Sequence, residues 1–217
     1  MIDNKRIPDY IDSLIPENSR IIEEIRNEAV ALDMPIIRRD GEQLLKSILK
    51  IKKPKRILEI GTCVGYSAII MASVSGDESH IETLEIGKAD YEMALANVAK
   101  AGYEDRITCY LCDASDKLKE YVSVGEKFDF IFMDAAKGQY INWLPDVTEI
   151  LNPGGVLLSD NILHDGDIVE SRFAVERRDR TTHSRLRDYL YELTHSDMYT
   201  TSVINVADGM SISVKND

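Results

Sequence analysis

Alternation of strands and helices is the feature that most constrains the fold of this chain. From Arg56 onward, short apolar runs typical of buried strands alternate five times with longer segments of helical periodicity. The five predicted strands are residues 56–60, 80–86, 106–113, 127–134 and 155–161. Repeated strand–helix alternation predicts a doubly wound, mostly parallel sheet with helices on both faces.

The two ends of the chain follow different patterns. Residues 17–32 carry an apolar stripe at helical spacing, and residues 42–50 continue as a second helix. Residues 1–54 are therefore predicted to form a helical cap within one domain that spans 1–217. At the other end, 199–214 reads as two strands joined by Asp208-Gly209, which is a hairpin signal. The hairpin brings the predicted sheet to seven strands and makes the last strand antiparallel.

Composition excludes several classes of protein. With 44% hydrophobic and 29% charged residues, the chain is an ordinary globular protein without an apolar run of the ~20 residues that span a bilayer. Its N-terminus has no secretory pattern, so we expect a cytoplasmic protein without a membrane partner. The net charge of −12 argues against a large nonspecific nucleic-acid surface. Of three cysteines, Cys109 and Cys112 should lie on opposite faces of a strand and pack rather than bind metal.

A glycine-containing turn and two acids suggest a nucleoside ligand. Gly61 and Gly65 follow the first predicted strand, but Cys63 occupies the second glycine position of the dinucleotide pattern G-x-G-x-x-G. Glu85 ends the second strand, where an acid can accept hydrogen bonds from ribose hydroxyls. Asp113 ends the third strand. This combination favours S-adenosylmethionine over NAD.

Three oxygen donors end the fourth and fifth predicted strands. Asp134 ends one of them, and Asp160 and Asn161 end the other. Because parallel strands end at one edge of a sheet, these groups should converge there. Carboxylate and amide oxygens suit Mg²⁺ or Ca²⁺, and the absence of histidine and cysteine argues against zinc. Lys137 follows Asp134 in a short loop, where it could accept a proton.

These motifs together resemble a known family. ILEIGTCVGYSA, TLEI, CDA, MDAAKGQY and LLSDNI are similar to the successive motifs of the metal-dependent catechol and caffeoyl-CoA type O-methyltransferases, a class I family with a Rossmann-like sheet. The resemblance covers nearly the whole chain. The segments MPII and DAAKGQY are similar to the branch that methylates 5-hydroxyuridine in the tRNA of Gram-positive bacteria.

The resemblance implies a role for particular residues. It implies S-adenosylmethionine contacts at Ile37, Gly61, Ser67, Glu85, Asp113, Ala114 and Asp134. It implies Mg²⁺ at Asp134, Asp160 and Asn161, with Lys137 as general base. It also implies a homodimer.

The substrate stays open at this point. The resemblance implies Mg²⁺-dependent conversion of 5-hydroxyuridine at tRNA position 34 to 5-methoxyuridine. The alternative is a small catechol-like phenol, since both substrates offer a metal two adjacent oxygens. A third possibility is a noncatalytic nucleotide-binding module with the same fold.

An arginine-rich segment favours the RNA. Six arginines between Arg172 and Arg187 face only two acids, and Arg38 and Arg39 can join them. They could contact phosphates beside a target base in the anticodon loop. The alternative is a solvated helix start with local ion pairs. The candidate phosphate contacts are Arg38, Arg172, Arg177, Arg178 and Arg180.

Overall fold

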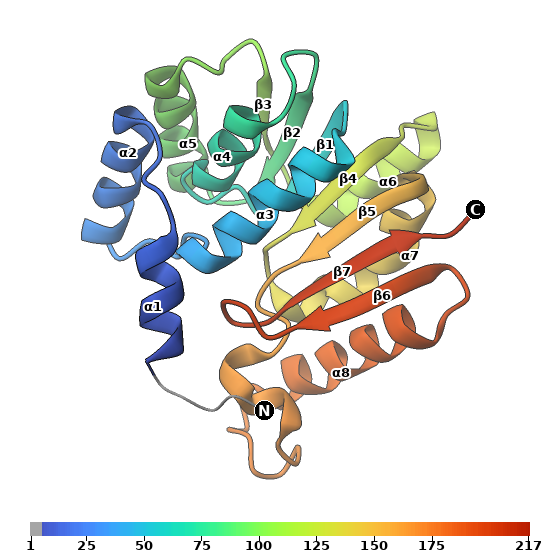
Figure 1. The fold of residues 1–217 in the computed structure, drawn as a ribbon. Coiled ribbons are helices and arrows are strands. Elements are labelled where there is room, and N and C mark those ends of the chain that lie inside the picture. The colour runs from blue at the N-terminus through green and yellow to red at the C-terminus, as the bar shows by residue number, and fades with distance from the viewer. Residues whose placement is uncertain (1–5) are drawn as a thin grey trace.

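The protein contains one seven-stranded sheet flanked by helices on both faces. The structure is a computed structural model in which residues 6–217 are described. The strand order is β3-β2-β1-β4-β5-β7-β6, and β1 to β5 run parallel, whereas β7 is antiparallel to both of its neighbours. The predicted fold class is therefore confirmed (Figure 1). The strands are β1 (Arg56–Ile60), β2 (His80–Glu85), β3 (Ile107–Leu111), β4 (Phe128–Met133), β5 (Leu151–Ser159), β6 (Tyr199–Ile204) and β7 (Met210–Lys215).

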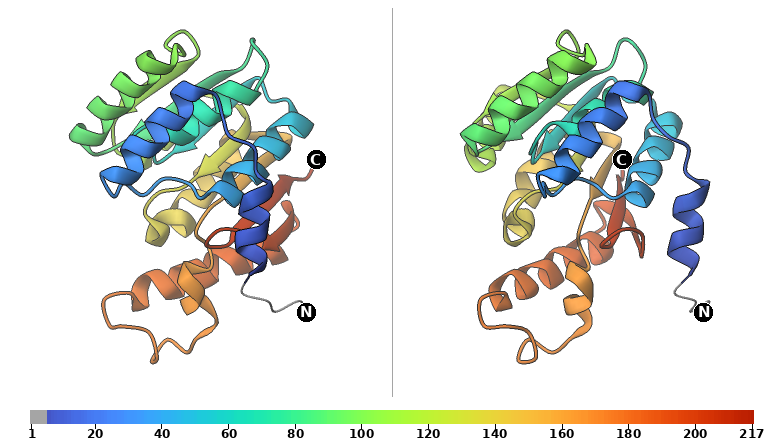
Figure 2. Two further views of the ribbon diagram at one scale, coloured as in Figure 1. Left: turned by 60° about the vertical axis from the view of Figure 1, so that its left-hand side comes forward. Right: turned by 90° about the vertical axis from the view of Figure 1, so that its left-hand side faces the viewer.

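The helices form two layers, one on each side of the sheet (Figure 2). The α-helices are α1 (Ile7–Leu14), α2 (Arg20–Ala31), α3 (Arg39–Lys52), α4 (Tyr66–Val74), α5 (Lys88–Ala101), α6 (Ala114–Val124), α7 (Tyr140–Ile150) and α8 (Arg180–His195). Two short 3₁₀ helices, η1 (Lys137–Gln139) and η2 (His164–Val169), follow β4 and β5. Helices α2 to α5 contribute to the apolar core on one face, and α6 to α8 contribute to the core on the other.

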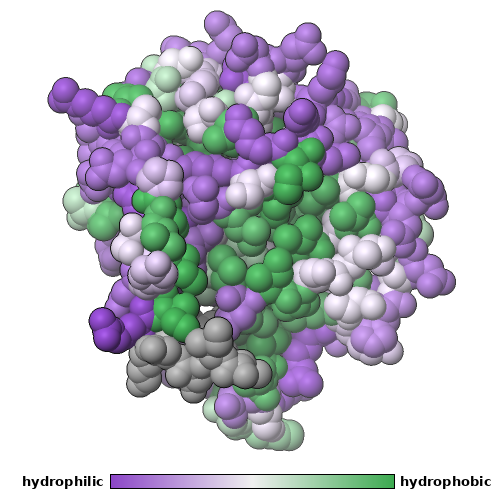
Figure 3. All heavy atoms as spheres, in the orientation of Figure 1, coloured by the Kyte–Doolittle hydropathy of each residue, from purple (hydrophilic) through white to green (hydrophobic). Residues whose placement is uncertain are grey.

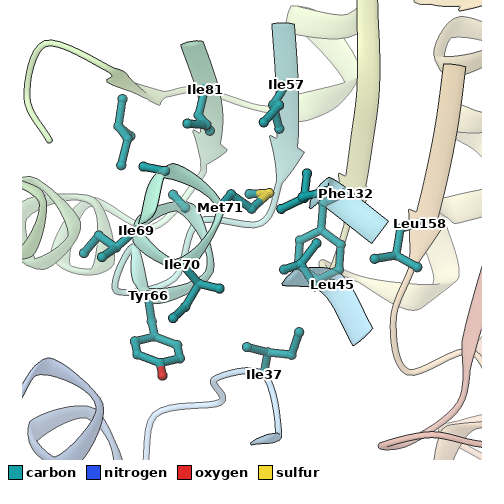
Figure 4. Packing of buried hydrophobic residues seen from close by; sticks show 14 of the residues in the cluster. Ile37, Leu45, Ile57, Tyr66, Ile69, Ile70, Met71, Ile81, Phe132 and Leu158 are labelled. Carbon is teal, nitrogen blue, oxygen red and sulfur yellow. The ribbon is translucent and has the colours of Figure 1, made fainter. Parts of the chain in front are cut away.

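The sheet side chains alternate between these two cores. Along β4, Phe130 and Phe132 belong to the first core, whereas Ile131 and Met133 belong to the second. Successive strand residues point to opposite faces, so a continuous apolar run supplies both cores at once. Figure 4 shows Phe132 among side chains from α3, α4 and β5. Cys109 packs against the first core and Cys112 against the second, as predicted, and both are free thiols.

The start of β5 differs from the prediction. The predicted strand begins at residue 155, but β5 begins at Leu151 and includes residues 152–154. Leu151 pairs with Phe128, and the register shifts before Val156 pairs with Phe130. The irregularity takes up the Asn-Pro-Gly-Gly residues without ending the strand, as bulges do.

Two of the N-terminal helices pack on one face of the sheet, and the third, α1, has exposed apolar side chains. Helices α2 and α3 pack against α4 on one face of the sheet. Helix α1 leaves Tyr10, Ile11 and Leu14 exposed. Figure 3 shows further apolar side chains over α3, β6 and β7, where none of the described helices covers them. Within residues 6–217, no helix is long and apolar enough to cross a membrane.

Candidate active site

A cavity of about 800 Å³ lies at the carboxyl ends of the parallel strands. Its wall includes residues from the segment before α3, from the turn after β1, and from the loop before β7. The structure thus places most of the predicted site residues around one space. The predicted residues that line it are Ile37, Arg38, Gly61, Ser67, Glu85, Asp113, Ala114, Asp134, Lys137, Asp160 and Asn161.

Gly61 allows the ends of β1 and β4 to meet. It has a φ of 104°, and a side chain at this position would collide with the carbonyl oxygen of Asp134. The backbone N–H of Asp134 donates to the Ile60 carbonyl at 3.0 Å, which fixes the two strand ends side by side. The glycine is therefore required for the close approach as well as for the turn. Ser67 follows in the first turn of α4.

Beneath this turn lies Glu59, which was not among the predicted site residues. It is fully buried, and its Oε2 accepts a hydrogen bond from Thr83 at 2.5 Å. Within the described residues its Oε1 has no hydrogen-bond partner. Burial raises the pKa of Glu59 to about 8, although Ser67 and Thr83 oppose the shift. Glu59 lies inside a buried strand and not at its end. The one signal in the sequence that could have identified it is an acidic residue within an apolar run.

The predicted ribose acid already supports the backbone around it. Glu85 Oε2 accepts from the N–H of Cys63 at 2.8 Å, and its Oε1 accepts from the N–H of Gly87 at 2.7 Å. These bonds fix the carboxylate at the cavity wall. Ribose hydroxyls can still donate to it, because each carboxylate oxygen can accept more than one bond.

The region predicted to bind adenine is formed by the start of α6 and by α7. Asp113 accepts from the Ser115 N–H at 2.7 Å and caps α6. Trp143 on α7 also lines the cavity, and its indole N–H donates to the Ser115 hydroxyl at 3.0 Å. Trp143 was not predicted as a site residue, because a tryptophan within a helical pattern is ordinarily a core residue.

The acid at the end of β5 is affected by the acid at the end of β4. Asp160 is 2% exposed, and burial together with the negative charge of Asp134 raises the pKa of its carboxyl to about 7. The N–H of Asn161, which donates to Asp160 at 2.7 Å, opposes this shift. A cation or a proton between the two carboxylates would relieve their repulsion.

The donors fit the predicted metal in their chemistry. Within residues 6–217 no group of three histidine, cysteine, aspartate or glutamate side chains could hold a metal. The candidate set is instead two carboxylates, Asp134 and Asp160, with the amide of Asn161. Such oxygen donors suit Mg²⁺, which keeps several water ligands. Magnesium itself stays a prediction.

Lys137 is positioned by α8. Its Nζ lies 3.0 Å from Asp134 Oδ1, and it begins η1. Arg185 on α8 donates to the carbonyl of Gly138 at 3.1 Å, so α8 holds the loop that carries the lysine. This contact joins the end of the arginine-rich segment to the cavity wall.

Asp208, which was predicted only as part of a hairpin turn, lines the cavity. It accepts from Asn161 Nδ2 at 3.2 Å and from Arg38 Nη1 at 3.2 Å. Arg38, a predicted phosphate contact, is thus paired at the cavity wall. Arg39 is paired with Glu23 at 2.5 Å, which lowers the pKa of Glu23 to about 2.

The other predicted phosphate contacts lie outside the cavity wall, on the loop before α8 and at the first residue of that helix. Arg178 pairs with Glu176 and Asp179, as the local ion-pair alternative expects. Arg180 donates to the carbonyls of Val175 and Phe173. Within the described chain, Arg172 and Arg177 form neither an ion pair nor a hydrogen bond.

Comparison with known proteins gives a consistent result. The chain is 30% identical over 175 residues to the caffeoyl-CoA O-methyltransferase of Stellaria longipes, covering 77% of this chain and 73% of the relative. A crystal structure from Staphylococcus aureus superposes with a TM-score of 0.87 at 30% identity, covering 96% and 98% of the two chains. An O-methyltransferase from Bacillus cereus, solved with S-adenosylhomocysteine, has the same fold, with a TM-score of 0.84, 24% identity and 96% coverage of both chains.

The sequence profile of the O-methyltransferase family matches residues 13–216. This match spans nearly the whole chain and includes all the strand ends that form the cavity. It decides against the noncatalytic nucleotide-binding module considered above. The protein therefore belongs to the O-methyltransferase family, and the prediction of an O-methyltransferase is confirmed.

Proposed function

We propose that the cavity binds S-adenosylmethionine and transfers its methyl group to a ring hydroxyl that has a second oxygen beside it. The observation that carries this proposal is the clustering of the Gly61 turn, Glu85, Asp134, Asp160 and Lys137 around one cavity. The S-adenosylhomocysteine bound by the Bacillus cereus relative supports the cofactor. The strand-end acids support the requirement for two substrate oxygens.

The residues of the chain would divide the work as follows. Glu85 and Asp113 would hold the nucleoside in the cavity that Asp134 also lines. The substrate oxygen would take the methyl carbon in line as the carbon–sulfur bond breaks, and its proton would pass to Lys137 Nζ, which has to be a neutral amine to accept it. Mg²⁺ held by Asp134, Asp160 and Asn161 would supply electrostatic stabilisation of the developing oxyanion.

A small phenolic substrate has the most support from the relatives. The Stellaria longipes relative is a caffeoyl-CoA O-methyltransferase. A catechol-like ring carries two adjacent oxygens of the kind that a metal between Asp134 and Asp160 can hold. The cavity volume of about 800 Å³ is within the range of small-molecule sites.

A tRNA 5-hydroxyuridine is the second candidate, because of the exposed arginine loop. Its 5-hydroxyl and C4 carbonyl present the same pair of oxygens to the site. Arg172 and Arg177 are exposed on the loop that leads into α8, and α8 contacts η1 beside Lys137. These two arginines could contact phosphates next to a base that enters the cavity.

Methyl transfer from isotope-labelled S-adenosylmethionine to a panel of catechols, and to tRNA that contains 5-hydroxyuridine, tests the proposal. Transfer to a catechol alone supports the phenolic substrate, whereas nucleoside mass spectrometry showing 5-methoxyuridine supports the tRNA. No transfer to any substrate with neighbouring oxygens counts against the proposal.

An arginine variant separates the two substrates further. In the combined variant Arg172→Ala and Arg177→Ala, tRNA methylation should fall and lose salt sensitivity, while catechol methylation stays unchanged. Arg20→Ala with Lys119→Ala is the matched control, because it removes two exposed charges elsewhere. Equal tRNA activity in both double variants would refute the role of the loop.

We also propose a homodimer, as the family resemblance implies. The exposed apolar residues of α1, together with Ile51, Val203 and Val214, provide surface for a second copy. Light scattering after size exclusion should give twice the 24.5 kDa mass of the chain. A monomer at micromolar concentration would exclude it.

A further inference from the structure

Asp208 connects three segments that are distant in the sequence. Its carboxylate accepts a hydrogen bond from Asn161, which follows β5, and another from Arg38, which precedes α3. The side chain is 30% exposed and lines the same cavity as Asp134 and Asp160. A residue that was only a turn signal in the sequence therefore contacts a candidate metal ligand directly.

The backbone holds Asp208 and Asn161 together independently of this side-chain bond. The N–H of Leu163 donates to the Asp208 carbonyl at 3.1 Å, and the N–H of Ile162 donates to the Gly209 carbonyl at 2.9 Å. Gly209 has a φ of 86° and packs against the Leu163 side chain. The loop before β7 and the segment after β5 thus form one unit at the cavity wall.

The chemistry of the two side chains decides which way the amide points. A carboxylate only accepts hydrogen bonds, whereas an amide has one face that donates and one that accepts. The Asn161 amide must therefore turn its NH₂ group toward Asp208. Its oxygen is then left for another partner, and an oxygen is what Mg²⁺ requires.

We propose that Asp208 is a positioning residue that makes the Asn161 amide oxygen available to a divalent cation. This inference rests on the metal site of the proposed function. Without Asp208 the amide could turn over and present NH₂ to the cation, which would repel it. Groups behind the direct ligands commonly set metal affinity in this way.

The other oxygen of Asp208 gives the arrangement a second connection. Arg38 neighbours Ile37, which is buried and was predicted to cover the cofactor. The N–H of Ala207, next to Asp208, donates to Asp40 at 2.9 Å. Because these contacts also hold the segment before α3, the test must separate metal affinity from cofactor affinity.

Mn²⁺ binding, followed by electron paramagnetic resonance without substrate, measures metal affinity without depending on turnover. Asp208→Asn should weaken Mn²⁺ binding by roughly tenfold, because asparagine can bond to either face of the Asn161 amide. Asp197→Asn is the matched control. This exposed acid lies just before the start of β6, whereas Asp208 follows the end of that strand. S-adenosylmethionine affinity, measured by calorimetry, should be unchanged in both variants and also shows that they fold.

A double-mutant cycle tests whether Asp208 acts through Asn161. Asn161→Ala alone should weaken Mn²⁺ binding, and adding Asp208→Asn should weaken it little further. Independent, additive losses would show that Asp208 acts on the metal by itself and would overturn the inference. Unchanged affinity in Asp208→Asn would overturn it too, with the proposed metal site intact. If the wild-type protein binds no Mn²⁺, the metal site and the inference both fail.

Discussion

The ammonium of Lys137 lies 3.0 Å from the carboxylate of Asp134, and both side chains are less than one quarter exposed. The candidate base is therefore in direct contact with a carboxylate oxygen of the candidate metal ligand. A divalent cation bound at Asp134 would compete with Lys137 for that carboxylate and repel its charge. Metal binding and proton transfer at this site should consequently be coupled.

Lys137→Met should reduce methyl transfer by about 10²–10⁴-fold, the range for loss of a general base. The same change should leave Mn²⁺ affinity equal or higher, because it removes a competing cation. Lys137→Arg is the informative control, since arginine keeps the charge but does not release its proton. Near-wild-type single-turnover rates in Lys137→Arg would assign Lys137 an electrostatic role instead of a basic one.

Asp160→Ala should abolish the part of methyl transfer that EDTA removes from the wild-type enzyme. Its affinity for S-adenosylmethionine should change less than about threefold, because most of the predicted cofactor contacts lie at the carboxyl ends of β1, β2 and β3. Calorimetry and activity with and without EDTA measure both quantities. Wild-type activity of this variant in EDTA would exclude a metal role.

Gly61→Ala should destabilise the protein by at least about 1–2 kcal/mol, because its φ of 104° disfavours a side chain. The added methyl would also push the Asp134 carbonyl away and so disturb the cavity. Denaturant unfolding and cofactor binding should both show a loss. Gly102→Ala also has a positive φ but has open space around it, so it should lose stability without losing cofactor affinity.

Glu59→Gln should change how stability depends on pH. The unfolded carboxyl titrates near 4.5 and the folded one near 8, so the native state binds an extra proton between these values. Wild-type stability therefore falls as pH rises through this window, by up to about 1.4 kcal/mol per pH unit from this group. The variant cannot titrate there, so its stability relative to wild type should rise from pH 5 to pH 8.

Denaturant unfolding at both pH values measures the effect. Glu78→Gln, at an exposed glutamate that pairs with Lys55, should follow the wild-type trend. Parallel stability curves for wild type and Glu59→Gln would contradict a raised pKa for this buried acid.

Sequence alone was sufficient for the sheet and for much of the cavity. Apolar runs mark buried strands, and the acid that ends each run, such as Glu85 or Asp134, marks the sheet edge. Because the strands are parallel, their carboxyl ends lie at the same edge of the sheet, and no knowledge of long-range contacts is needed to predict this. The ligand edge of an α/β sheet is therefore readable from local pattern.

Contacts between distant segments were not readable in this way. Asp208 bonds with Arg38, 170 residues away, and its sequence neighbourhood shows only a turn. Trp143 reaches the cavity because α7 packs beside α6, which a helical stripe does not reveal. The ion pairs of Arg178 and the hydrogen bonds of Arg180 likewise depend on the conformation of the loop before α8.

The position of β7 has a consequence for synthesis of the protein. Strand β7 comes after β6 in the chain but lies between β5 and β6 in the sheet. Until residues 210–215 have left the ribosome, β6 has no neighbouring strand to pair with, and the loop that carries Asp208 is tethered on one side only. The contact between Asn161 and Asp208 therefore depends on a segment that is made after β1 to β6.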